Sequence, residues 1–81
     1  MALPPFSKVA LKVDLREDGL QKGDVATIVD YLPGKDCEHG YALEVFNAVG
    51  DTIAVVMVAQ SAVEPLTADQ VLSVRPLVRT P

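Results

Sequence analysis

Short runs of β-branched and aromatic residues, separated by glycine, proline and polar clusters, constrain this chain more than any other feature of its sequence. Within the runs, apolar residues either alternate with polar ones or continue without interruption. Alternation with a period of two is typical of a β-strand with one buried face. The runs are Lys8–Val13, Val25–Leu32, Tyr41–Phe46, Thr52–Ala59 and Val71–Arg75. The pattern therefore predicts an all-β chain of five strands.

The segments between the runs carry the residues that loops and turns require. A long polar loop, Asp14–Asp24, follows the first run, and we expect Leu15 and Leu20 to pin it to the core. Gly50 supplies a residue that tolerates a positive φ angle in a short hairpin loop after the third run. A single helical or 3-10 turn is expected at Thr67–Gln70, just before the last strand.

The size of the chain selects among all-β architectures. Regularly spaced short strands form a sandwich or a barrel, and 81 residues favour a small barrel because closure removes most exposed strand edges. The loop order is that of an SH3-like barrel, so we expect a small, five-stranded, partly open SH3-like barrel. We expect one domain over residues 8–76, an extended lead over 1–7 and a frayed tail over 77–81.

The sequence also bears on where the protein works. Cys37 is the single cysteine, so no internal disulfide can form, which fits a reducing compartment. The first residues lack the basic and apolar regions of a signal peptide. The longest apolar run, Ile53–Ala59, is far shorter than the roughly 20 residues of a membrane-spanning helix. We therefore expect a cytoplasmic protein with no membrane partner.

The charge balance argues against nucleic acid as the ligand. Eleven acidic residues outnumber seven basic ones, and the formal net charge is −4. Binding to nucleic acid draws much of its affinity from lysine and arginine on phosphates, and the basic residues here are spread along the chain. Two tyrosines, two phenylalanines and no tryptophan leave few platforms for stacking bases. We expect no nucleic-acid partner.

Residues 36–39 (Asp-Cys-Glu-His) hold the only combination that resembles a reactive site. A metal site would need three or four ligands, and the chain has no second cysteine or histidine. Cysteine–histidine catalysis would further need an oriented base and an oxyanion hole. The sequence contains no phosphate-binding glycine loop followed by lysine and serine or threonine. We therefore expect no catalytic residues, no metal and no cofactor, and interpret residues 36–39 as a solvated loop.

The fourth run is unusual because both of its faces are apolar. Ile53, Val55 and Met57 share one face, and Ala54, Val56 and Val58 share the other. A barrel strand should alternate between apolar and polar residues. The second face is therefore covered either by the chain's own segments 3–6 or 62–66 or by another chain, or the strand lies centrally in a tighter sandwich. The hypothesis for partner-binding residues is Phe46, Ala54, Val56 and Val58.

Four stretches of the sequence carry a resemblance to a known family: Gly19–Val29, Tyr41–Val45, Gly50–Val55 and Val74–Leu77. Together they resemble a family that is common in bacteria, notably cyanobacteria, and is catalogued as domain of unknown function family 4926. The resemblance extends from about Phe6 to Leu77. The family implies a short SH3-like barrel, and its members' position beside toxin-like genes implies an antitoxin-like or partner-binding role.

One part of that resemblance has a physical explanation of its own. The strand that follows a long loop must turn sharply, and Gly23 permits a positive φ angle or a close backbone approach there. Asp24 can accept hydrogen bonds from N–H groups of the loop. We interpret this pair of residues as a structural signature rather than a site.

The function expected from these observations is that of a non-catalytic protein-binding module. Its partner would be a toxin-like enzyme that it neutralises or a second copy of the chain. Two alternatives stay open at this point. The first is a small barrel that binds nucleic acid, which rests on analogy of fold. The second is a metal-dependent domain or small enzyme built on residues 36–39.

Overall fold

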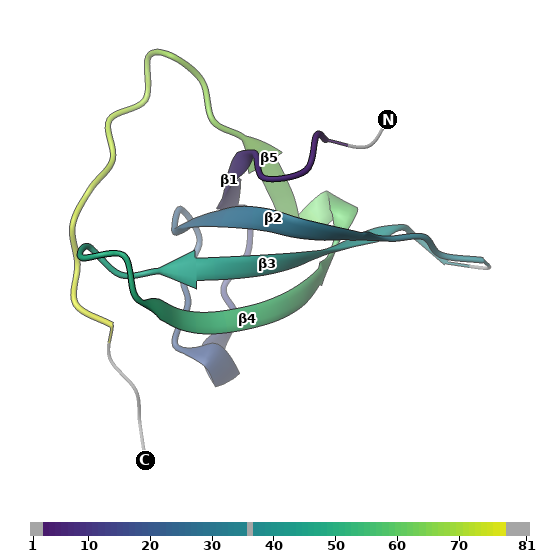
Figure 1. The fold of residues 1–81 in the computed structure, drawn as a ribbon, viewed down its shortest axis with the longest axis horizontal. Helices are drawn as coiled ribbons and strands as arrows, with labels where there is room; N and C mark the ends of the chain where they lie inside the picture. The colour runs from purple at the N-terminus through teal and green to yellow at the C-terminus, as the bar shows by residue number, and fades with distance from the viewer. Residues whose placement is uncertain (1–2, 36, 78–81) are drawn as a thin grey trace.

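The computed structural model describes residues 3–35 and 37–77, which form one five-stranded antiparallel sheet (Figure 1). The strand order is β4-β3-β2-β1-β5, and two 3-10 turns, η1 and η2, interrupt the connections. Within the described ranges no pairing joins β4 to β5, so the sheet is not closed into a barrel. The all-β prediction is confirmed. The elements are β1 (Lys8–Leu11), η1 (Arg16–Asp18), β2 (Val25–Leu32), β3 (Gly40–Phe46), β4 (Thr52–Ala59), η2 (Gln60–Ala62) and β5 (Val63–Pro65).

The fifth strand lies elsewhere than the sequence indicated. It was expected at Val71–Arg75, but β5 is Val63–Pro65 and pairs with β1. Val63 enters the core there, and Pro65 is tolerated because it ends a strand at the sheet's edge. The 3-10 turn that precedes this strand is η2, whereas Thr67–Gln70 forms a turn closed by a 3.1 Å hydrogen bond from the Gln70 N–H to the Thr67 carbonyl.

The segment after β5 is extended but belongs to no strand. Val71 and Val74 expose 92% and 91% of their surface, so their strand-forming side chains are left without packing partners. The segment is anchored near its end, where Arg75 pairs with Asp24 and Leu77 packs against the core. The frayed tail expected over 77–81 falls largely on residues 78–81, which lie outside the described part of the chain.

The core is built from one face of the sheet and from the loop after β1. Tyr41 has no exposed surface, and its hydroxyl accepts hydrogen bonds from the Leu3 N–H (2.9 Å) and the Gln60 side-chain amide (3.1 Å). Its one polar atom is therefore satisfied inside an apolar cluster. That cluster consists of Val9, Leu11, Leu20, Ala26, Ile28, Tyr41, Leu43, Val45, Val56, Val58 and Val63.

The N-terminal lead is attached to the sheet rather than free. The Phe6 N–H donates to the Ile28 carbonyl at 2.7 Å, and the Ile28 N–H donates to the Ser7 carbonyl at 3.0 Å. Leu3 lies on the core side, because its N–H reaches the buried Tyr41 hydroxyl. Leu3 therefore packs against the core, whereas residues 4–6 are exposed.

Candidate interaction surface

The pairing of β3 with β4 decides which face of β4 is buried. Val56 lies opposite Leu43 and Val58 lies opposite Tyr41, and both valines are buried with their partners. Ala54 is partly buried on the same face. Three of the four residues in the partner-binding hypothesis, Ala54, Val56 and Val58, therefore face the core. In this fold a partner cannot reach Val56 or Val58.

The opposite face of β4 is exposed and apolar. Val55 and Met57 expose 61% and 75% of their surface, and Phe46 of β3 exposes 44%. Phe46 is the one residue of the hypothesis that lies on this side. We call the three side chains Phe46, Val55 and Met57 the outer patch. Val55 and Met57 were absent from the hypothesis because both faces of the run are equally apolar, and no signal within the run distinguishes them.

The residues of β3 that lie opposite the outer patch are one small residue and one acidic residue. Met57 lies opposite Ala42, whose methyl group leaves the thioether side chain free of a bulky neighbour. Val55 lies opposite Glu44, and the Glu44 carboxylate accepts a hydrogen bond from the Thr52 hydroxyl. Methionine is flexible and adapts to irregular apolar partners. The patch is therefore apolar, with Glu44 opposite Val55 and with Asp30 of β2 on the far side of Ala42 from Met57.

The loop Asp14–Asp24 is held from within, as the sequence predicted. Leu15 and Leu20 exchange two backbone hydrogen bonds of 2.9 and 3.0 Å, and the Leu20 side chain is buried. Gly19 ends η1 with a φ angle of 72°, a conformation that favours glycine. The loop therefore has a defined shape rather than a free one.

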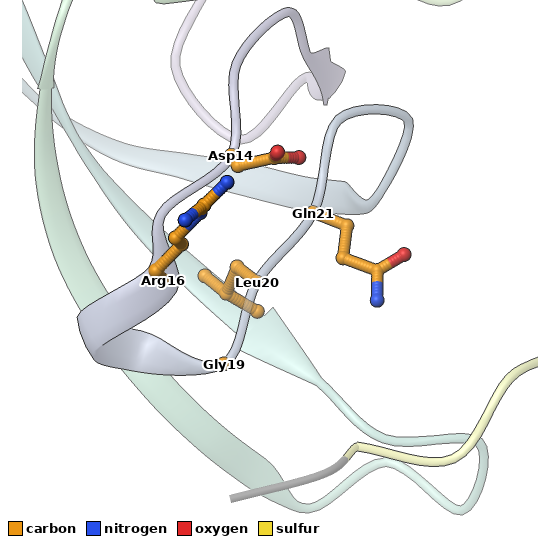
Figure 2. A pocket seen from close by; sticks show the side chains of 5 residues that line it. All are labelled: Asp14, Arg16, Gly19, Leu20 and Gln21. Atoms are coloured by element: carbon orange, nitrogen blue, oxygen red, sulfur yellow. The ribbon is translucent and has the colours of Figure 1, made fainter. Parts of the chain in front are cut away.

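A shallow hollow lies along this loop, lined by Asp14, Arg16, Gly19, Leu20 and Gln21 (Figure 2). Asp14 uses one carboxylate oxygen to accept the Lys22 N–H at 2.9 Å. Figure 2 shows the Gln21 side chain directed away from Asp14 and Arg16. The polar groups of the hollow do not converge on one point, which a small-molecule site would require.

Asp24, at the end of the loop, joins two distant parts of the chain. Its carboxylate accepts the Gln21 N–H at 2.8 Å, as the sequence predicted, and it pairs with the Arg75 guanidinium through two hydrogen bonds. Partial burial raises the pKa of Asp24, but the bonds from Arg75 and Gln21 outweigh that effect and hold the pKa below its ordinary value. The pair is structural, since it ties the segment after β5 to the loop.

Polar groups of the loop before β3 also form hydrogen bonds within the domain. The Glu38 carboxylate accepts hydrogen bonds from the Ser61 N–H (2.6 Å) and hydroxyl (3.1 Å). The Nδ1 atom of His39 accepts the Gly34 N–H at 3.0 Å, and the imidazole ring lies 5.4 Å from the Tyr31 ring. Cys37 is exposed, and Asp36 lies outside the described residues. Residues 3–35 and 37–77 contain no cluster of three or more histidine, cysteine or carboxylate side chains suited to a metal ion.

Comparison with known proteins identifies a family without assigning an activity. A family model described as Domain of unknown function (DUF4926) matches residues 6–71, so the stretch Val74–Leu77 lies beyond the matched region. No curated protein and no solved structure matches the chain. In the described part of the chain, no helix is long and apolar enough to cross a membrane.

Proposed function

Because the matched region covers most of its length, the chain belongs to the family described as Domain of unknown function (DUF4926), and on that premise we propose that it is a non-catalytic protein-binding module. The observation that carries the proposal is the outer patch. Three large apolar side chains stand exposed on the outer side of two neighbouring strands. Contiguous exposed apolar surface on a small protein marks an interaction site.

The sheet beneath the patch is suited to rigid binding. The side chains on the other face of β3 and β4, including Leu43 and Val56, are buried and interlocked. A partner that covers Val55 and Met57 would therefore order few additional groups, which limits the entropic cost of association. Full burial of an exposed side chain of this size contributes about 1.5–3 kcal/mol to the free energy of association. The contribution is smaller where part of the side chain is already buried in the free protein.

Finer features of the proposal rest on the resemblance to the family and on the strand order. A long loop after β1, η2 between β4 and β5, and the pairing of β1 with both β2 and β5 favour an SH3-like arrangement. The resemblance favours a bacterial source, and the single cysteine favours a cytoplasmic location. The resemblance favours an antitoxin-like role, in which the partner is a toxin-like enzyme. Binding through an apolar patch fits that role, because inhibition of an enzyme by a small domain needs contact area rather than catalysis.

The test compares capture by the wild-type protein with capture by two lysine variants. Met57→Lys places a charge in the outer patch, whereas Val13→Lys places one on an exposed valine just after β1. Proteins that co-purify from the native host are identified, produced separately and titrated against all three forms. We expect Met57→Lys to weaken binding at least tenfold and Val13→Lys to leave it unchanged. Equal binding by both variants would refute the outer patch as the binding surface.

A further inference from the structure

The two edges of the sheet are protected very differently. The edge strand β5 is three residues long and carries Glu64 and Pro65, and both features discourage pairing with another strand. The edge strand β4 is eight residues long and contains no charged residue, glycine or proline. A long, uncharged, apolar edge is a template for strand pairing unless another segment covers it. Figure 1 shows β4 at the border of the sheet, with β3 on its other side.

The hydrogen bonds to β3 show which backbone groups of β4 point outward. The Gln60 N–H donates to the His39 carbonyl at 2.8 Å, which continues the register of Gly40 opposite Ala59. The Val58 carbonyl oxygen would lie 2.6 Å from a Cβ atom added to Gly40 of β3. The Val58 carbonyl therefore also points toward β3. In an antiparallel pair, bonded and non-bonded positions alternate.

That alternation gives the direction of the backbone N–H and C=O groups for residues 54–59, where the register with β3 is regular. Residues on the core face, such as Val56 and Val58, direct their backbone groups toward β3. Their neighbours Val55, Met57 and Ala59 direct theirs toward the open edge. All three are exposed, and Met57 is the middle one.

We propose that β4 pairs with β4 of a second copy of this chain in antiparallel orientation, with the two-fold axis at Met57. Met57 of one copy then lies opposite Met57 of the other, and Val55 lies opposite Ala59. This register uses all three outward-facing residues of each copy. A two-fold axis perpendicular to the sheet keeps the outer faces of both copies on one side, so the sheet continues across the dimer with its apolar core face aligned.

The charge distribution favours this edge for contact between identical acidic chains. Each copy carries a formal net charge of −4, but β4 itself is uncharged. On the outer face, Glu44 lies one strand inward, opposite Val55. Two such residues would be separated by three strand spacings, about 14 Å, which exceeds the screening length of about 8 Å at physiological salt. Self-pairing at β4 therefore meets little repulsion.

This inference rests on the proposed protein-binding function and goes beyond it, because it adds a second copy of the chain as a partner. The two fail separately, because the capture experiment above uses other proteins whereas the experiment below uses the purified chain alone. A purified chain that stays monomeric while Met57→Lys still abolishes capture would overturn only the inference.

The experiment is disulfide trapping at the proposed axis, with Cys37→Ser as the background because Cys37 is exposed. In the paired dimer the two residue-57 Cα atoms would be about 5.5 Å apart, within the range of about 4.4–6.8 Å that a disulfide spans. Met57→Cys should therefore form a covalent dimer rapidly under mild oxidation. Val55→Cys is the matched control, because its two copies would be offset by four residues, about 13 Å.

Two further results decide the proposal. Sedimentation of the cysteine-free wild-type background over a concentration series should show a monomer–dimer equilibrium, and Met57→Lys should shift it at least tenfold toward monomer, whereas Val13→Lys should not. Circular dichroism confirms that each variant stays folded. A monomer at all concentrations, or faster trapping at residue 55 than at residue 57, would overturn the proposed pairing.

Discussion

Arg75 and Asp24 are 51 residues apart in the chain and form a two-bond ion pair, in which the Arg75 Nε atom donates to the Asp24 Oδ1 atom at 3.0 Å. The Arg75 Nη2 atom bonds the other carboxylate oxygen and also donates to the Gly19 carbonyl at 3.1 Å. The pair therefore connects the end of the loop after β1 with the extended segment after β5. Without it, little besides Leu77 would hold that segment to the domain.

The ion pair makes stability depend on pH in a defined direction. The pKa of Asp24 in the folded chain lies below its ordinary value of 3.8, so the unfolded chain binds the proton more readily. Its contribution to stability is therefore complete at neutral pH and is lost as the pH falls below about 4. The urea midpoint of Asp24→Asn should lie below that of the wild type at pH 7, and the difference should shrink on acidification. A difference that is constant with pH would contradict this assignment.

The hydroxyl of Tyr41 should contribute measurably to stability. It accepts two hydrogen bonds, from Leu3 and Gln60, at a fully buried side chain. Tyr41→Phe leaves the Leu3 N–H without this acceptor, so we expect a loss of about 1 kcal/mol in the free energy of unfolding. Tyr31→Phe is the control, because that ring is 38% exposed. Equal effects of the two substitutions in urea denaturation would argue against the role of the Tyr41 hydroxyl.

Leu20 should be the main apolar anchor of the loop Asp14–Asp24. Its side chain is 2% exposed within the core cluster, whereas Leu15 only packs partly against that cluster. Leu20→Ala should therefore lower the free energy of unfolding by about 2–5 kcal/mol, and Leu15→Ala by clearly less. Chemical denaturation gives both values. If Leu15→Ala proved the more damaging, the loop would be anchored differently from the arrangement described.

His39 should carry the proton of its neutral imidazole on Nε2. A backbone N–H can only donate, and the Gly34 N–H lies 3.0 Å from Nδ1, which must therefore accept. Two-dimensional NMR spectra that correlate the ring nitrogens with the ring protons distinguish the two tautomers directly. A neutral form with its proton on Nδ1 would show that the bond between Gly34 and His39 does not form in solution.

Local sequence patterns predicted four of the five strands, because each depends on its own residues. The two-residue period in Tyr41–Phe46 already separates the buried Tyr41 from the exposed Phe46. Gly50 and Gly23 have φ angles of 91° and 95°, as turn chemistry requires. The role of Asp24 as an acceptor for loop N–H groups also followed from local sequence, but its pairing with Arg75 did not.

The candidate site was less predictable than the fold. The sequence located the unusual run at residues 53–59 and included Phe46 in the partner-binding set. It could not assign the faces of the run, because valine, isoleucine and methionine are suited to either side of a sheet. The pairing of Val56 with Leu43 resolves this and leaves Val55 and Met57 outside.

The sequence by itself determined that the chain forms short strands joined by glycine-bearing turns and a long leucine-anchored loop, because these features arise from the conformational preferences of neighbouring residues. Only the tertiary structure decided which segment becomes the fifth strand and which face of β4 meets solvent. Val63–Pro65 and Val71–Arg75 both contain strand-forming residues, but η2 brings the first directly to the free edge of β1. Such choices depend on which backbone edge lies within reach, and that is a property of the assembled sheet.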